Sequence, residues 1–161
     1  MSQQDQTYRF FKSHAKEWQI KAEDEVFSTI HNRHQAVMET MKKYPTGSAL
    51  LDVGCGTGQL AIEASTNGWN SLGLDFAEDM IEIARKNNEN TSASAEFICG
   101  SVFDFESDQS FDVISAQGFI EYISLEQLDE FLQLLKYICN PGGSIAIGSR
   151  NRLFNVHFFF F

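Results

Sequence analysis

Three glycines at alternate positions mark the stretch LLDVGCGTGQL as the part of the chain best suited to hold a ligand. Gly54, Gly56 and Gly58 come directly after an apolar run and directly before a segment that favours a helix. Glycine in such a turn either relieves backbone strain or lets a ligand contact the backbone. The ligands to be distinguished are a dinucleotide, a phosphate group and a third class of molecule.

Both phosphate-binding patterns fail on this stretch. The dinucleotide pattern GxGxxG requires a glycine at its sixth position, where this sequence has Gln59. The phosphate loop GxxxxGK[ST] requires a lysine, and no lysine occurs between Tyr44 and Arg85. Both phosphate ligands are therefore disfavoured.

Two carboxylates near the glycines indicate what the third class of ligand is. Asp52 precedes the turn, and Asp75 ends the next apolar run. A carboxylate about 20 residues beyond such a turn can accept hydrogen bonds from both hydroxyls of a ribose. Asp52 would attract a positively charged amino group and repel a phosphate. The two acids together predict a nucleoside that carries a cationic tail.

Short apolar runs alternate with amphipathic segments after residue 45. The expected strands are 48–53, 71–75, 96–99, 111–116 and 144–148, and the expected helices between them are 59–66, 77–87 and 125–140. Ser124 and Gln127 have the spacing of a capping box for the last helix. Strands that are apolar throughout are typical of a parallel sheet covered on both faces, so the predicted fold class is α/β.

One structural unit with an N-terminal helical segment is expected. Residues 1–45 are rich in charged and helix-forming types, and Pro45 with Gly47 ends that segment. Residues 46–161 would form the α/β unit. A chain of 161 residues is long enough to bury one core.

Charge and cysteine usage limit the partners and the compartment. The net charge is −10, and no lysine or arginine occurs between Lys86 and Lys136. Nucleic-acid binding requires clustered cations, so no nucleic-acid partner is expected. No signal peptide or membrane-spanning run is recognised, so no membrane partner is expected either. Three isolated cysteines without CxxC pairing are typical of a reducing compartment, and the cytoplasm is predicted.

The segments LDVGCGTG and LGLDFAEDMIEIAR resemble the class I S-adenosylmethionine-dependent methyltransferases. The resemblance covers about residues 48–150 and implies a Rossmann-like three-layer sandwich with a mostly parallel sheet. It implies S-adenosylmethionine as the cofactor and S-adenosylhomocysteine as the product. The positions to which cofactor contacts are carried over are Asp52, Gly54, Cys55, Gly56, Asp75, Phe76, Met80, Ser101, Val102 and Gln117.

The resemblance also implies a role for each part of this set. The backbone around the glycines would approach the methionine part, Asp75 would bind the ribose, and Phe76 and Met80 would flank the adenine. Gln117, at the end of the fourth strand, would meet the methionine end, and Phe119 would lie beside the reacting methyl group.

The adenine end departs from the family pattern. Members of the family often have an aspartate after the third strand that accepts a hydrogen bond from the adenine amino group, and Ser101 stands there. A serine hydroxyl can still accept one hydrogen bond, and the Val102 amide can donate to the ring. Asp104 is a possible substitute, although an exposed loop acid is the favoured interpretation.

The lead-in segment YRFFKSHAKEW resembles that of ubiquinone-biosynthesis-type methyltransferases, whose helices cover the cofactor. The resemblance implies that residues 1–45 form a helical lid. Tyr8, Phe11 and Trp18 would then cover the sulfonium through their aromatic faces. Packing of this segment on the sheet is an equally weighted alternative.

The acceptor is predicted to be a small molecule methylated on oxygen, nitrogen or carbon. The fourth strand lacks the [DN]PP[YF] motif of enzymes that methylate amino groups of bases, and no cysteine nucleophile follows it. Relatives that methylate hydroxyls often have Glu-His where this chain has Glu121 and Tyr122, so no catalytic base is identified. His31 and His34 have no convincing third ligand, so no metal site is expected.

The family fold normally has seven strands, of which the last two are antiparallel, but this sequence ends soon after the fifth. About five strands and a truncated fold are therefore expected. The uncovered fifth strand would be an exposed edge, and Phe158 to Phe161 could pack on it, contact another chain or be disordered. Self-association through this edge is one predicted interaction.

A non-catalytic cofactor-binding or partner-binding module is the alternative function, and a nicotinamide-dependent reductase is a distant third.

Overall fold

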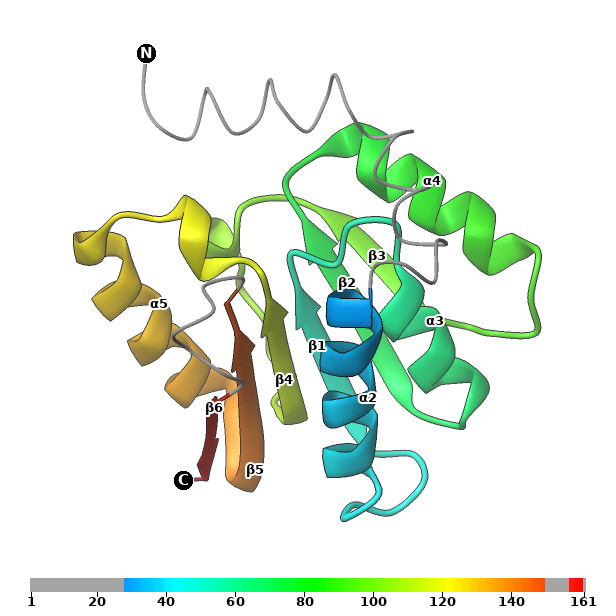
Figure 1. Ribbon diagram of the computed structural model, residues 1–161, viewed down its shortest axis with the longest axis horizontal. Helices are drawn as coiled ribbons and strands as arrows, with labels where there is room; N and C mark the ends of the chain where they lie inside the picture. The colour runs from blue at the N-terminus through cyan, green and yellow to red at the C-terminus, as the bar shows by residue number, and fades with distance from the viewer. Residues whose placement is uncertain (1–27, 150–156, 161) are drawn as a thin grey trace.

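The computed structural model describes residues 28–149 and 157–160 (Figure 1). The predicted lid residues Tyr8, Phe11 and Trp18 lie outside the described residues, and so does Phe161. The helical lid of residues 1–45 therefore stays a prediction.

The described residues form a six-stranded sheet with helices between the strands (Figure 1). The strands are β1 (Ala49–Val53), β2 (Asn70–Asp75), β3 (Glu96–Cys99), β4 (Phe111–Gln117), β5 (Cys139–Gly148) and β6 (His157–Phe160). The α-helices are α2 (Ser28–Met41), α3 (Gln59–Thr66), α4 (Glu78–Glu89) and α5 (Leu125–Ile138), and two short 3₁₀ helices are η1 (Val102–Asp104) and η2 (Ile120–Tyr122).

The strand order is β3-β2-β1-β4-β5-β6, and the first five strands run parallel to one another. The order reverses between β1 and β4, so the loops that leave these two strands diverge at their carboxyl ends. In open α/β sheets this point of reversal is where ligands bind. The predicted α/β fold with a mostly parallel, Rossmann-like sheet is confirmed.

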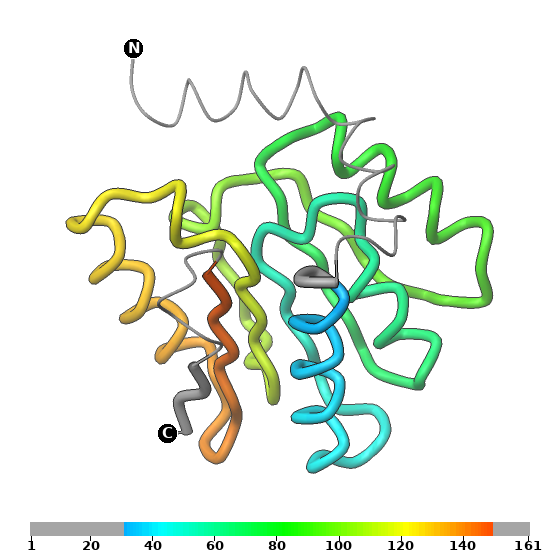
Figure 2. Tube along the Cα trace, in the orientation of Figure 1, coloured from blue at the N-terminus to red at the C-terminus, as the bar shows by residue number. Residues whose placement is uncertain are grey.

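The sheet is the middle of three layers. On one face, β1 and β4 pack against α5 through Phe131, Leu135 and Ile138. On the other face, Val37 and Met41 of α2 pack with residues of α3 and of the central strands. In the tube view α4 and α5 lie at opposite ends of the sheet (Figure 2). Burial on both faces explains why the central strands read as continuous apolar runs.

The last helix and last parallel strand have different bounds from those predicted. The capping box of Ser124 and Gln127 is present, but α5 ends at Ile138 and β5 begins at Cys139. The Pro-Gly-Gly stretch therefore forms an irregular start of β5, where its pairing with β4 shifts register. The Asn140 amide donates to Asp112 Oδ1 at 2.9 Å and holds this irregular start against β4.

The C-terminal strand adds one strand to the five predicted. Residues His157–Phe160 pair antiparallel with β5, so the alternative in which the tail packs on this edge is the one that the structure shows. The predicted self-association required an uncovered edge of β5, but β6 pairs with that edge. Self-association stays a prediction. None of the helices in the described part of the chain is long and apolar enough to cross a membrane.

Candidate functional site

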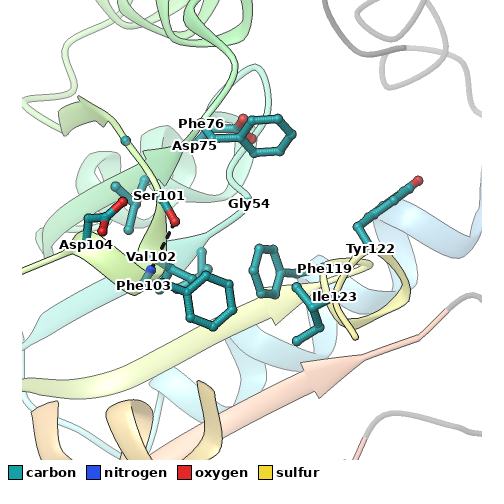
Figure 3. A pocket seen from close by; sticks show the side chains of 13 residues that line it. Gly54, Asp75, Phe76, Ser101, Val102, Phe103, Asp104, Phe119, Tyr122 and Ile123 are labelled. Atoms are coloured by element: carbon teal, nitrogen blue, oxygen red, sulfur yellow. Dashed lines mark hydrogen bonds between the residues drawn. The ribbon is translucent and has the colours of Figure 1, made fainter. Parts of the chain in front are cut away.

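A cavity of about 260 Å³ lies at the carboxyl ends of the strands, where the strand order reverses (Figure 3). Its walls come from the turn after β1, the end of β2, the loop after β3 and the loop after β4. The lining residues are Val53, Gly54, Leu74, Asp75, Phe76, Gly100, Ser101, Val102, Phe103, Asp104, Phe119, Tyr122 and Ile123.

The glycine turn has backbone angles that favour glycine at all three positions. The φ angles are +71° at Gly54, +53° at Gly56 and +82° at Gly58. An added Cβ at Gly58 would lie 2.7 Å from the Phe97 ring and 2.9 Å from the Ala84 side chain. The third glycine therefore lets α3 and α4 approach closely, which the sequence analysis did not identify.

The first glycine of the turn lies under an aromatic ring. An added Cβ at Gly54 would be 3.4 Å from the Phe119 ring, and Phe119 lines the cavity. The Phe119 ring also packs against Phe131 of α5, with 4.8 Å between ring centroids. Phe119 therefore covers the backbone at Gly54, and the part of the cavity that is open to a ligand lies toward Asp75 and Ser101.

Asp75 joins the glycine turn to the next helix. Its Oδ2 accepts a hydrogen bond from the Gly56 N–H and its Oδ1 accepts one from the Ala77 N–H, both at 2.9 Å. Burial raises the pKa of Asp75, and the hydrogen bonds from Ala77, Gly56 and Phe76 oppose that rise. A carboxylate has about four lone-pair positions, so Asp75 can accept further hydrogen bonds from the cavity.

Asp52 lies inside the sheet and not in the cavity wall. It faces Ser115 of β4 in the strand register and has an exposed fraction of only 4%. Burial raises the pKa of Asp52 to about 7, while the Ser115 hydroxyl lowers it and the charge of Asp75 raises it further. Its predicted attraction for a cationic amino group stays a prediction.

The loop after β3 forms the wall opposite Phe76. Ser101 Oγ accepts a hydrogen bond from the Phe103 N–H at 3.2 Å and so caps η1 (Figure 3). Val102 is buried in the cavity wall. Asp104 is exposed, as the favoured interpretation predicted, and it also lines the cavity.

The remaining predicted contacts do not line the cavity. Cys55 and Gly56 lie within the turn, and Met80 is buried beside Ala77 at the start of α4. Gln117 donates from its amide nitrogen to the Ala146 carbonyl at 3.0 Å, and its Oε1 is buried without a partner among the described residues. Their predicted cofactor contacts stay predictions.

Four apolar side chains that line the cavity were not predicted as site residues, namely Val53, Leu74, Phe103 and Ile123. Phe103 follows the capping serine in η1, and Ile123 follows η2. The aromatic stretch VFDF directly after the third strand was a usable signal for Phe103. Tyr122 also lines the cavity.

The histidine pair on α2 lies away from this cavity. His31 is exposed and His34 is partly buried. Burial lowers the pKa of His34 to about 4, and the charges of Arg33 and His31 lower it further. Within the described ranges, no three histidine, cysteine or acidic side chains are placed to hold a metal ion.

The comparisons with known proteins agree with this geometry. The family model described as "Methyltransferase domain" matches residues 50–143. The ubiquinone biosynthesis O-methyltransferase of Vibrio atlanticus is 28% identical over 115 residues, covering 70% of this chain and 48% of the relative. The protein of the same name from Nitrobacter winogradskyi is 30% identical over 106 residues, covering 66% and 40%. The chain thus spans about half the length of the curated relatives that it matches, or less.

A solved structure supports the fold. The magnesium protoporphyrin IX methyltransferase of Synechocystis, solved with bound SAM, superposes with a TM-score of 0.76. The match covers 91% of this chain and 76% of that one at 16% identity. From the family match, together with the glycine turn and the sheet order, the chain belongs to the class I S-adenosylmethionine-dependent methyltransferase family.

Proposed function

We propose that the chain binds S-adenosylmethionine in this cavity and transfers its methyl group to a small molecule, leaving S-adenosylhomocysteine. The observation that carries the proposal is the position of Asp75. This carboxylate lines the cavity and is fixed by two backbone N–H groups, one from the glycine turn and one from the start of α4. A rigid acceptor beside a glycine turn suits the two hydroxyls of a ribose.

The cavity walls suit the other parts of the cofactor. Phe76 and Val102 give apolar contacts for a base, and the turn at Gly54 offers backbone for an amino-acid tail. Ligand pockets are usually about 300 Å³ or larger, and this cavity is about 260 Å³. Because Phe119 covers Gly54, the proposal includes a movement of that ring when the tail binds.

The cofactor would supply a methyl group bonded to a positively charged sulfur. An acceptor atom would attack the methyl carbon directly and displace the sulfur. The protein then has two tasks, to align the acceptor and to exclude water. Holding the reacting atoms about 3 Å apart and in line lowers much of the barrier. The Phe103, Phe119 and Ile123 side chains make the wall nearest the loop after β4 apolar, which keeps water from the methyl group.

The acceptor in this proposal is a small molecule, methylated on oxygen, nitrogen or carbon. Tyr122 lines the cavity, and its hydroxyl can orient the acceptor. Relatives at 28% and 30% identity carry the name ubiquinone biosynthesis O-methyltransferase, which favours oxygen among the three atoms. The three free cysteines support a reducing compartment such as the cytoplasm.

A non-catalytic module that binds the cofactor or a partner is the second candidate. The position of Ser101 favours it, because the hydroxyl that would replace the family aspartate is engaged with the Phe103 N–H. The two candidates differ in turnover. Formation of S-adenosylhomocysteine with any acceptor in a broad panel would exclude the module.

Calorimetry with S-adenosylmethionine and S-adenosylhomocysteine tests the proposal. We expect both to bind, and we expect Asp75→Asn to bind both much more weakly because one carboxylate oxygen becomes an amide donor. Asp108→Asn, at an exposed position that does not line the cavity, is the matched control. Absence of heat with either ligand, or an unchanged affinity in Asp75→Asn, would overturn the proposed role of this site.

A further inference from the structure

The loop that carries Phe119 over Gly54 is attached to the end of β5, outside the cavity. We infer that Glu121 and Ser149 are positioning residues, which fix the Phe119 ring and so set how tightly the amino-acid tail of the cofactor binds. Neither of the two lines the cavity, so each would act through the ring. This inference rests on the proposed function, since it concerns the ring that has to move when the tail binds.

The start of this loop is a closed turn. Phe119 is the N-cap residue of η2, and Tyr122 is the last residue of η2. The Tyr122 N–H donates to the Phe119 carbonyl at 3.0 Å, which closes the turn. Figure 3 shows the Phe119 and Tyr122 side chains leaving this turn. Glu121 belongs to the same turn, so a contact that fixes Glu121 also fixes the point where the Phe119 side chain begins.

Two hydrogen bonds join this turn to the end of β5. The Gly118 N–H donates to the Gly148 carbonyl at 2.6 Å. The Ser149 hydroxyl donates to Glu121 Oε1 at 3.2 Å. Gly148 is the last residue of β5, and Ser149 follows it directly. The two bonds therefore lie on either side of Phe119 in the chain and tie its backbone to one end of the sheet.

Opposite charges flank the backbone directly before Phe119. The position that a Cβ would take at Gly118 lies 3.3 Å from Arg33 Nη1 and 3.9 Å from Glu121 Oε2. Arg33 belongs to α2 and has an exposed fraction of 7%. Little solvent screens a guanidinium at such a position, so its attraction for a nearby carboxylate is stronger than in water. The charge of Arg33 therefore favours the same position of Glu121 as the Ser149 hydroxyl does.

Packing against Phe131 is the other contact that holds the Phe119 ring. The two ring centroids are 4.8 Å apart. This contact acts on the ring itself, whereas Glu121 and Ser149 act on the backbone that carries the ring. If the Phe131 contact were sufficient, the ring would stay over Gly54 without the bond between Ser149 and Glu121. The two explanations therefore predict different results when that bond is removed.

Removal of the bond between Ser149 and Glu121 should make the Phe119 ring easier to move. The arrangement that leaves Gly54 open would then be more populated before binding, so the tail would bind more tightly. A hydrogen bond to a charged group usually changes an equilibrium by about one to two orders of magnitude. Because Phe131 still holds the ring, we expect a smaller change, about two- to fivefold, in the affinity for S-adenosylhomocysteine relative to that for adenosine. Adenosine lacks the tail, so the ratio cancels losses that affect both ligands equally.

The test measures the affinities for S-adenosylhomocysteine and adenosine by calorimetry on the whole chain. We expect Glu121→Ala and Ser149→Ala each to raise the ratio of the two affinities about two- to fivefold. Ser149→Ala removes only one hydroxyl group and is the milder change for the fold. Glu130→Ala changes an exposed acid of α5 outside the cavity wall, so it is the matched control and should keep the wild-type ratio.

The same substitution in a Phe119→Ala background distinguishes positioning from a general structural role. Without the ring, Glu121→Ala should change the ratio by less than about twofold, because the group through which it acts is absent. A residue that only supports the fold would lower both affinities and leave the ratio unchanged in either background. A rise in the ratio that persists without the ring would show that Glu121 acts on the tail by another route, and it would overturn the inference.

The outcomes also separate this inference from the function on which it rests. Unchanged ratios in Glu121→Ala and Ser149→Ala, in a chain that binds S-adenosylhomocysteine, overturn the inference and leave the proposed function standing. A ratio that rises in Glu130→Ala as well would assign the effect to the overall charge and would overturn the inference too. Binding of neither ligand by the wild-type protein refutes the proposed function and the inference with it.

Discussion

The third glycine of the turn gives a sharp prediction about stability. In Gly58→Ala the new methyl group would lie 2.7 Å from Phe97 and 2.9 Å from Ala84, and φ there is +82°. A left-handed backbone angle costs a non-glycine residue about 1–2 kcal/mol. Overpacking adds about 1–3 kcal/mol, because the Ala84 Cβ lies on a helix and cannot rotate away. The free energy of unfolding should therefore fall by roughly 2–5 kcal/mol.

A second glycine of the same turn separates the two costs. Gly56 has φ of +53°, but nothing lies within 4 Å of an added Cβ. Gly56→Ala should therefore lose only the backbone share, about 1–2 kcal/mol. Urea denaturation of the two variants and the wild type measures the difference directly. Equal losses in the two variants would refute the packing role of Gly58, and a loss below about 1 kcal/mol in Gly58→Ala would refute both parts of the argument.

Three further predictions follow from the same geometry. Burial raises the pKa of Asp52 from 3.8 to about 7, so the folded state binds the extra proton and wild-type stability falls as pH rises between these values. The side chain in Asp52→Asn does not titrate. Urea denaturation across this pH range should therefore show its free energy of unfolding rising by up to about 4 kcal/mol relative to that of the wild type. A difference in free energy of unfolding that does not change with pH would contradict the raised pKa. In Phe119→Ala no ring has to move away from Gly54 before the amino-acid tail can bind. The ratio of the affinity for S-adenosylhomocysteine to that for adenosine, measured by calorimetry, should therefore rise by about two- to tenfold. An unchanged ratio would contradict this. Asp112→Ala removes the acceptor of the Ala49 N–H, bonded at 2.8 Å, and should lower the free energy of unfolding by about 1–3 kcal/mol without changing ligand affinity.

The order of the elements could be predicted from the sequence because it depends on local patterns. Apolar runs bounded by turn residues mark the strands, and the helix expected at 59–66 is present as α3 (Gln59–Thr66). The start of β5 could not be predicted in this way. Pro141 looks like a helix stop followed by a loop, but a hydrogen bond from Asn140 to Asp112, 28 positions earlier, holds the segment against β4.

The part of the site that follows from topology could also be predicted. Parallel strands bring their carboxyl ends to one edge of the sheet, so the glycine turn after β1 and Asp75 at the end of β2 had to meet. Side-chain placement beyond that point depends on contacts between distant residues. Asp52 lies against Ser115 of β4, and Gly58 lies against Phe97 of β3. Neither neighbour can be identified from the residues around the glycine turn.

The cavity wall formed by the loop after β3 could be predicted only in part. Ser101 directly precedes a short helical turn, and serine at such a position commonly caps the turn. Only a ligand contact was expected of Ser101, and its capping of η1 was not predicted. The position of Asp104 in the same wall follows from that cap, because the turn sets where its side chain begins.

A crystal structure of the chain with S-adenosylhomocysteine would show whether Asp75 binds the ribose. We expect both ribose hydroxyls to donate hydrogen bonds to the Asp75 carboxylate, with the base between Phe76 and Val102. A ligand bound outside this cavity, or a ribose inside it that makes no contact with Asp75, would refute the assignment of Asp75 to the ribose.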